Sequence, residues 1–201
     1  MAASSSRRIA AAILAACAAA AGAQEREQLP IQVEARGGTD FDYSNGVFKF
    51  YGITITQGAV KITAERAIAN GLDIKDSSWE FSGAVHITMP DSALASDTAR
   101  VRFSAGEISS ADVTGAPATF RQERKEEHAE GRANRIDYDL KRGTVVLDGD
   151  AWLSDSGKEI TGAKLIYSMT NQRVVSEDGP VVITIQPGEA PQTAPKPKPQ
   201  P

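Results

Sequence analysis

Cysteine and histidine are both scarce in this chain of 201 residues. The one cysteine, Cys17, lies near the N-terminus, so no disulfide can form within the rest of the chain. The two histidines, His86 and His128, lack the neighbouring ligand spacing of a metal site, and we expect both to be solvated. The sequence therefore predicts neither a disulfide-stabilised fold nor a metal centre.

A surplus of positive charge is also missing, since the net charge is −4. Proteins that bind nucleic acid need a basic face that neutralises phosphates. The sequence contains no Gly-x-Ser-x-Gly elbow, phosphate-binding loop or dinucleotide fingerprint. Asp137 and Asp139 share one face of a predicted strand and could serve acid/base chemistry, although two solvent-facing aspartates explain the pattern more simply. We expect no catalytic residue, no cofactor and no nucleic-acid partner.

The only long apolar stretch lies at the N-terminus. Arg7-Arg8 precedes the apolar residues 9–21, which are too few to span a bilayer comfortably. Ala21-Gly22-Ala23 fits a small-residue cleavage site, so residues 1–23 are predicted to be an export signal peptide. Leu14-Ala15-Ala16-Cys17 also resembles a lipobox, which leaves anchoring through an acylated Cys17 as the alternative.

Helical periodicity is absent after the leader, and alternation with a period of two takes its place. The alternation is clearest in residues 79–89, where apolar side chains recur at Trp79, Phe81, Val85, Ile87 and Met89. Pro90-Asp91-Ser92 then predicts a turn into a second strand that contains Leu94, Val101 and Phe103. These residues predict one β-hairpin.

The hairpin pattern recurs along the chain. Its copies are marked by glycines about 31 to 34 residues apart, a period typical of stacked arrays: Gly52, Gly83, Gly115 and Gly149. A glycine inside a strand usually marks a bulge, and the alternation changes parity at Gly52 as a bulge would require. We therefore predict an all-β fold of many antiparallel strands.

The ends of this array are predicted from local signals. Residues 31–35 form a first strand, which Pro30 marks as an edge, and Val181, Ile183 and Ile185 lie on a last strand. The charged residues 122–127 are expected to be a solvated loop or hairpin tip. One domain is predicted over residues 24–188. The Pro/Lys-rich residues 189–201 cannot bury enough surface to offset their ordering entropy and are expected to be disordered.

Several segments carry a family resemblance when they are read in order. They are Leu29-Pro30-Ile31-Gln32-Val33-Glu34-Ala35, Phe50-Tyr51-Gly52, Thr56-Gln57-Gly58, Val60-Lys61-Ile62-Thr63-Ala64-Glu65-Arg66, Gly115-Ala116-Pro117-Ala118-Thr119-Phe120, Gly131-Arg132-Ala133, Ile136-Asp137-Tyr138, Leu147-Asp148-Gly149-Asp150-Ala151-Trp152-Leu153 and Ile160-Thr161-Gly162. Together they resemble the lipopolysaccharide transport bridge family, the LptA/OstA-like periplasmic proteins. The hairpin over residues 79–103 departs from the family pattern as an extra unit.

The resemblance implies a twisted antiparallel β-jelly roll, open along one seam. It also implies a non-catalytic carrier that bridges the inner and outer membranes and holds lipopolysaccharide by its lipid A part in a hydrophobic groove. The groove candidates are the apolar residues of the matching strands: Ile31, Val33, Ile53, Ile55, Ile62, Phe120, Tyr138, Leu140, Leu147 and Leu153.

The resemblance further implies head-to-tail pairing of copies through exposed strand edges. The edge candidates are Ile31, Val33, Val181, Ile183 and Ile185. Related jelly-roll domains of an inner-membrane anchor and an outer-membrane translocon would be the terminal partners. Two other readings stay open, namely a structural β-scaffold that polymerises without ligand and a polysaccharide-active enzyme on a β-solenoid.

Overall fold

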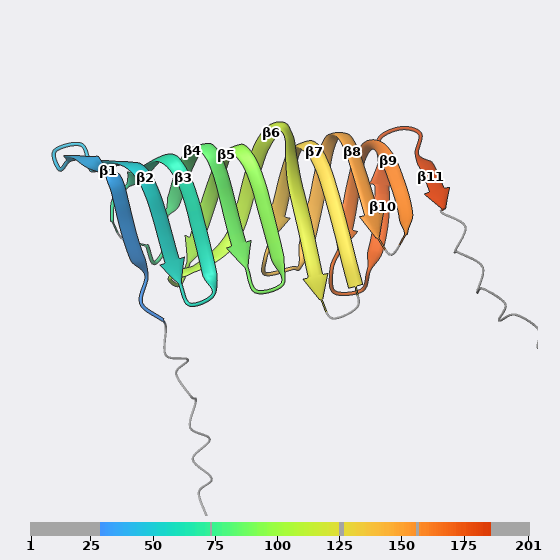
Figure 1. Ribbon diagram of the computed structural model, residues 1–201, viewed down its shortest axis with the longest axis horizontal. Coiled ribbons are helices and arrows are strands. Elements are labelled where there is room, and N and C mark those ends of the chain that lie inside the picture. The colour runs from blue at the N-terminus through green and yellow to red at the C-terminus, as the bar shows by residue number, and fades with distance from the viewer. Residues whose placement is uncertain (1–28, 73, 125–126, 156, 186–201) are drawn as a thin grey trace, which may run out of the picture.

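A computed structural model of the chain describes residues 29–72, 74–124, 127–155 and 157–185. These residues form one antiparallel sheet of 11 strands (Figure 1). The strands are β1 (Gln32–Asp42), β2 (Val47–Gln57), β3 (Val60–Asn70), β4 (Ser78–Met89), β5 (Ser92–Ser104), β6 (Glu107–Arg124), β7 (Glu127–Asp139), β8 (Thr144–Asp155), β9 (Lys158–Ser168), β10 (Arg173–Glu177) and β11 (Val182–Ile185). The predicted leader (1–23) and tail (189–201) lie outside the described residues.

The sheet is a meander in which each strand from β1 to β10 pairs with the next one along the chain. β11 returns to β9, so that β10 pairs with residues 164–168 of β9 and β11 pairs with residues 158–161. Within the described residues, β1 does not pair with β10 or β11, and the sheet stays open. The predicted all-β antiparallel architecture of repeated hairpins is confirmed. Within the same part of the chain, no helix has the length and apolar character needed to cross a membrane.

The long strands bend midway along one continuous line, which we call the crease (Figure 1). The strand register shifts there, for example between Ser82 and Val85 of β4. The predicted glycines lie on this line, and Gly52, Gly83 and Gly149 have φ values of 60°, 80° and 77°. This left-handed region is readily adopted only by glycine. The regular spacing of glycines in the sequence therefore marks one fold line across successive strands.

The crease divides the sheet into two layers that face each other. Layer A contains residues 38–42, 47–51, 66–70, 78–82, 98–104, 107–114, 135–139, 144–148, 164–168 and 173–177. Layer B contains residues 32–35, 53–57, 60–64, 85–89, 92–95, 118–124, 127–133, 151–155, 158–162 and 182–185.

The bulges at the crease keep the apolar face of each strand on the inside of the fold. In β2, Phe50 is buried before the bulge and Ile53 after it, an odd spacing that an unbroken strand would place on opposite faces. In β3, the buried pair Ala64 and Ala67 shows the same change of parity. Both halves of each strand therefore contribute to one core.

That core lies between the two layers. Its largest fully buried side chains include Trp79, Phe81 and Phe120. Within layer A, the rings of Phe50 and Trp79 stack with their centroids 5.4 Å apart. Across the layers, the ring of Phe120 contacts that of Tyr138 edge-on at 6.0 Å between centroids. The aromatic residues thus tie layer A to layer B.

Residues 122–127 were predicted to be a solvated loop or hairpin tip, and of these two the hairpin is right: β6 and β7 pair as far as Arg124 and Glu127. The solvated loop is wrong. β6 continues to Arg124 and β7 begins at Glu127, so the described part of this segment is strand. Gln122 is buried, because it lies on the inner face of β6, where its side chain accepts a hydrogen bond from the hydroxyl of Tyr167. The charged residues of this segment interrupt the apolar alternation. The sequence pattern therefore did not show that the strand continues a few residues further.

We predict that Gly149→Ala destabilises the fold by about 1–3 kcal/mol, since alanine at this positive φ is strained. In addition, the new Cβ would lie 2.9 Å from Nδ2 of Asn134. Gly46→Ala is the matched control, because Gly46 has a φ of 66° but nothing within 4 Å of an added Cβ. Urea unfolding monitored by tryptophan fluorescence measures both variants. Equal losses for the two would contradict a role for close packing at the crease.

Candidate functional site

The space between the two layers gathers most of the predicted groove residues. Seven of the ten are buried on its inner surface: Ile53, Ile55, Ile62, Phe120, Tyr138, Leu147 and Leu153. The other three, Ile31, Val33 and Leu140, are not fully buried: Ile31 and Val33 lie at the N-terminal end, and Leu140 follows β7. Most of the predicted groove residues therefore lie in one continuous apolar interior. Side chains fill the middle of that interior.

A cavity of about 410 Å³ opens into this interior at the β1 end. It is lined by Val33, Ala35, Thr39, Phe41, Phe50, Leu72, Ile74 and Trp79. Several of these apolar side chains remain accessible, with exposed fractions of 36% for Val33, 37% for Phe41 and 49% for Leu72. Exposed apolar surface of this kind is typical of binding or assembly sites.

A second, smaller cavity of about 220 Å³ lies at the opposite end. Leu153 and Ile160 of layer B and Val174 of layer A line it, together with the polar residues Asp155, Lys158 and Gln172. The interior therefore has a hollow at each end of the sheet. The end near β1 is the more apolar of the two, because aromatic side chains line it.

The long edge opposite the crease is where the turns of the two layers meet, and we call it the seam. No backbone ladder joins the layers there within the described residues, because every strand pairs only inside its own layer or across the crease. Side-chain hydrogen bonds span it instead, such as the one from Nε2 of Gln57 to the carbonyl oxygen of Gly106 at 2.9 Å. Along its length, the interior is therefore bounded by continuous backbone at the crease and by side chains at the seam.

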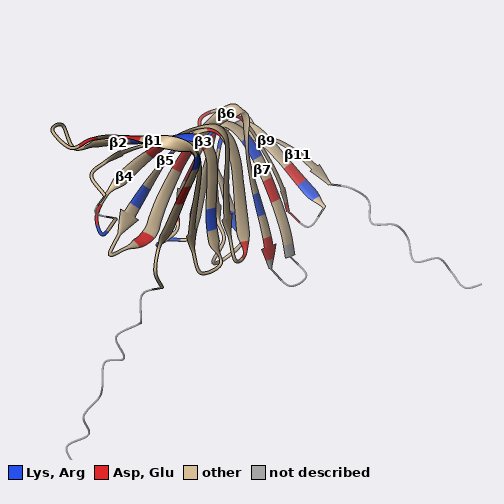
Figure 2. Ribbon diagram, turned by 60° about the vertical axis from the view of Figure 1, so that its left-hand side comes forward, with Lys and Arg blue, Asp and Glu red and all other residues tan. Residues whose placement is uncertain are grey.

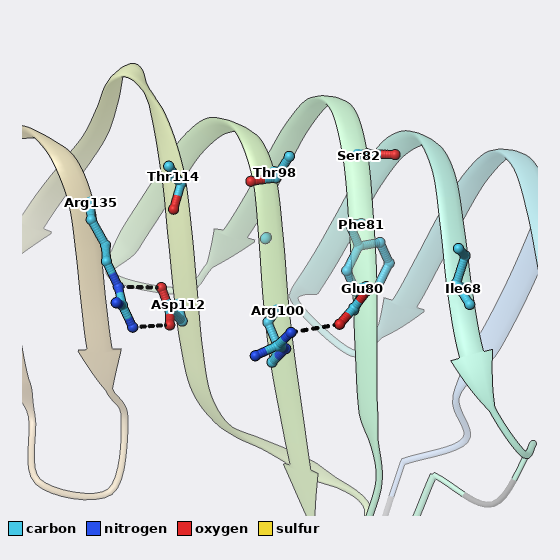
Figure 3. A pocket seen from close by; sticks show the side chains of 10 residues that line it. Ile68, Glu80, Phe81, Ser82, Thr98, Arg100, Asp112, Thr114 and Arg135 are labelled. Carbon is cyan, nitrogen blue, oxygen red and sulfur yellow. Dashed lines mark hydrogen bonds and ion pairs between the residues drawn. The ribbon is translucent and has the colours of Figure 1, made fainter.

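Lys, Arg, Asp and Glu residues lie along the strands (Figure 2), and ion pairs such as Lys49 with Asp40 and Arg121 with Glu130 are exposed. A groove of about 420 Å³ on layer A is lined by Glu80, Arg100, Asp112 and Arg135, among others (Figure 3). Arg100 donates to Glu80 at 2.7 Å, and Arg135 forms a two-pronged ion pair with Asp112. Both cations are paired across neighbouring strands, so this groove stabilises the sheet and offers no unpaired cation to a ligand.

The two aspartates that could have formed an acid/base pair lie two residues apart on β7, and neither is buried. Asp137 lies on the outer face, where partial burial raises the pKa of its carboxyl and the negative charge of Asp112 raises it further. Asp139, at the end of β7, accepts a hydrogen bond from the backbone N–H of Arg142. Both histidines are exposed, as predicted. Among the described residues, no group of three or more His, Cys, Asp or Glu could hold a metal ion.

Sequence reasoning selected Val33 but missed most of the other residues that line the cavity at the β1 end. Phe41 follows a Gly-Gly bulge, and Leu72 lies in the β3–β4 connection outside any alternating run. The available signal was the unusual density of aromatic residues over positions 41–51. Trp79 was recognised as core, but its place at the inner wall of this cavity depends on β1 folding over it.

The family model described as "LptA/(LptD N-terminal domain) LPS transport protein" matches residues 61–173, more than half of the chain. The chain belongs to this family. The matched residues include the hairpin over residues 79–103, which the motifs alone had indicated to be an extra unit.

Individual proteins similar to this chain are named LptA or LptA homologues, in agreement with the family model. The lipopolysaccharide export system protein LptA of Escherichia coli (strain K12) is 31% identical over 119 residues, which cover 57% of this chain and 64% of that protein. The LptA of Shigella flexneri matches equally well. The chain thus spans less than two thirds of the length of these relatives. The crystal structure of LptH from Pseudomonas aeruginosa, the LptA-homologous periplasmic component of its lipopolysaccharide transport device, shares the fold, with a TM-score of 0.51 at 19% identity over 79% of this chain and 96% of that one.

We predict that Asp137→Asn stabilises this LptA-family fold at neutral pH by less than about 1 kcal/mol. The folded-state pKa of Asp137 is raised, so ionisation disfavours folding above that pKa, and the penalty disappears below the unfolded-state pKa. The gain should therefore be present at pH 7 and absent near pH ~3. Urea unfolding at both pH values measures it, with Asp97→Asn as an exposed control. A gain that persists at the acidic pH would contradict this origin.

Proposed function

We propose that this chain is a non-catalytic periplasmic carrier of lipopolysaccharide, which it shelters by the lipid A part between its two layers. The supporting observation is a continuous apolar interior with a hollow at each end, in a chain of the LptA/LptD N-terminal family. Residues 1–23, read as an export signal, agree with this location. Carriage requires shelter and no reaction, which fits the absence of a recognisable catalytic motif in the sequence.

The physical requirement for such an interior is large. Exposing one acyl chain of about 12 carbons to water costs roughly 10 kcal/mol, at about 0.8 kcal/mol per CH₂ group. A lipid with several chains therefore cannot cross an aqueous compartment by free diffusion. A sheet folded on itself with a largely apolar inner face supplies the shelter, while the charged outer faces keep the protein in water (Figure 2).

The groove residues of this proposal are the apolar side chains that the structure gathers in the interior. Ile62, Leu147 and Leu153 are almost fully buried and come from both layers. Acyl chains would replace the contacts that these side chains now make with one another. The cavity near β1, the larger of the two end cavities, provides space in which this exchange could begin.

A photoreactive phenylalanine analogue at Phe120 tests the proposal directly. Phe120 is 1% exposed and lies on the inner face of layer B, so it should label lipid A when lipid A binds inside. The same analogue at His86, on the outer face of layer B, is the matched control and should give little labelling. Illumination of the purified protein with lipid A, followed by mass analysis, measures both. Equal labelling at the two positions would overturn an interior site.

The dense packing of the interior favours a second candidate, a structural β-scaffold that assembles without a ligand. Side chains such as Trp79, Ile136 and Val145 are fully buried by other parts of the chain. The stoichiometry of lipid A retained by the purified protein separates the two candidates. A carrier retains lipid A in a fixed ratio, and a scaffold retains none.

We also propose that copies of the chain pair end to end, and that the terminal copies pair with related jelly-roll domains of an inner-membrane anchor and an outer-membrane translocon. The two ends of the sheet support this. Within the described residues, β1 and β11 each have one unpaired edge. Val33 lies on β1 and Ile31 just before it, and Ile183 and Ile185 lie on β11 and Val181 just before it. A free strand edge presents unpaired backbone groups to another strand.

Ile183→Asp combined with Ile185→Asp should weaken this end-to-end pairing. These side chains are 59% and 67% exposed on β11, and charges on an edge strand oppose strand addition. The control is Ile68→Asp, because Ile68 is also exposed, at 43%, but lies on β3 inside the sheet. Sedimentation over a concentration series should show smaller assemblies for the edge variant alone. Unchanged assembly of the edge variant would contradict the proposal.

A further inference from the structure

The outer face of layer B contains a trough that the proposed lipid site does not use. It lies across the middle strands β4 to β8 and has a volume of about 460 Å³. Small side chains on β5 form its floor, namely Ala93 and Ala95. The strand register places longer side chains on either side of this floor, because Ala95 pairs with His86 on β4 and with Thr119 on β6. The trough is therefore built into the pairing of the sheet.

Arg132 forms the wall of the trough on the side of β7 and β8. It pairs with Trp152 in the strand register, and its guanidinium carbon lies over the indole, 4.7 Å from the centre of the ring. The indole is held in turn from β9, because Nε1 of Trp152 donates to Oε2 of Glu159 at 3.3 Å. A stacked guanidinium uses its flat face, so the N–H groups in its plane remain available as donors. Arg132 is thus a positioned cation.

The charge of Arg132 has no carboxylate partner in the described part of the chain. The other arginine that lines the trough, Arg121, is paired with Glu130 at 3.1 Å. No ion pair joins Arg132 to any described acidic residue. An oriented, exposed guanidinium can bind a carboxylate or phosphate group through two parallel hydrogen bonds. The trough therefore offers what the groove on layer A lacks.

We propose that this trough binds a sugar that carries one anionic substituent, a carboxylate or a phosphate. Arg132 would bind the substituent, and the sugar ring would lie on the floor formed by Ala93 and Ala95. A sugar ring presents C–H groups on its faces and hydroxyls around its rim, which matches an apolar floor between polar side chains. The hydroxyl of Thr119 and the imidazole of His86 can both donate to and accept from such hydroxyls.

The trough and the apolar interior lie on opposite faces of the same strands. Phe120 and Leu153 are buried inside, whereas the residues that precede them, Thr119 and Trp152, point outward. A sugar in the trough would therefore not compete for space with an acyl chain in the interior. For the same reason, the inference does not rest on the proposed carrier function and can fail or succeed without it.

The surroundings of Arg132 favour a compact ligand over an extended acidic one. Glu130 lies beside Arg121, and Glu159 lies beside Trp152, so two carboxylates are close to the trough. An acidic peptide or protein would carry further negative charges, which these carboxylates would repel. A sugar with a single anionic substituent can reach Arg132 and keep its uncharged hydroxyls near them.

Tryptophan fluorescence tests the site, because the two tryptophans of the chain report on different places. Trp152 lines the trough, whereas Trp79 is fully buried in the core. The probes are glucuronic acid, glucose 6-phosphate and glucose, which share one ring and differ at C6. Acetate and triglutamate present carboxylates without a sugar. Calorimetric titration with the same probes measures the dissociation constants without a fluorescent reporter.

We expect glucuronic acid or glucose 6-phosphate, or both, to bind at least about tenfold more tightly than glucose, acetate and triglutamate. The fluorescence change should disappear in Trp152→Phe, which leaves Trp79 as the reporter. Arg132→Gln should weaken binding at least about tenfold, because the fork of donors is lost. Arg100→Gln is the matched control and should bind normally, since Arg100 lies on layer A and is paired with Glu80.

Two results would overturn parts of the inference, and one would overturn all of it. Equally tight binding of acetate or triglutamate would exclude recognition of the sugar ring. Equally tight binding of glucose would exclude recognition of the anionic substituent. Unchanged binding of the acidic sugars by Arg132→Gln, or no saturable binding of either sugar by the unaltered protein, would overturn the site as a whole.

Discussion

The fold depends on one constraint, which is that a single sheet with one apolar face must bury that face against itself. The chain has no second sheet within its described residues and no helix layer to cover it. The crease satisfies the constraint, because bulges at residues such as Gly52 and Gly83 turn each strand through a sharp bend and keep its apolar side chains inside. The position of the crease determines where the two layers, the seam and the two ends of the interior lie.

Folding along the crease creates three kinds of boundary around the interior. The crease is continuous backbone, and the seam is held by side chains. In the part of the chain that the structure describes, the two ends are unpaired strand edges with cavities beside them. Each boundary suits a different task in the proposed carrier. In that proposal, the crease stabilises the fold and the ends pair with other copies. The seam is the side on which the interior can open to water.

The two ends of the sheet differ in construction. At one end, β1 is a single strand that crosses the crease and contributes to both layers. At the other, two separate strands share the task, since β10 pairs with β9 in layer A and β11 pairs with it in layer B. A head-to-tail contact needs two different surfaces, and this asymmetry supplies them. Charge is concentrated on the outer faces, where ion pairs such as Arg135 with Asp112 link neighbouring strands.

Most of the strands, their antiparallel hairpins and the bulges at the spaced glycines could be predicted from the amino-acid sequence, whereas the full lengths of β1 and β6 could not. Alternation at Trp79, Phe81 and Val85 indicates which side chains face inward, and the glycines indicate where the backbone can bend. Which strand halves meet across the interior became known only from the folded molecule. Alternation shows which side chains share a face of one strand. It does not show how close two strands lie when they are far apart in the chain. For this reason the contact of Gln122 with Tyr167 could not be predicted, because Gln122 lies in a charged segment that resembled a loop.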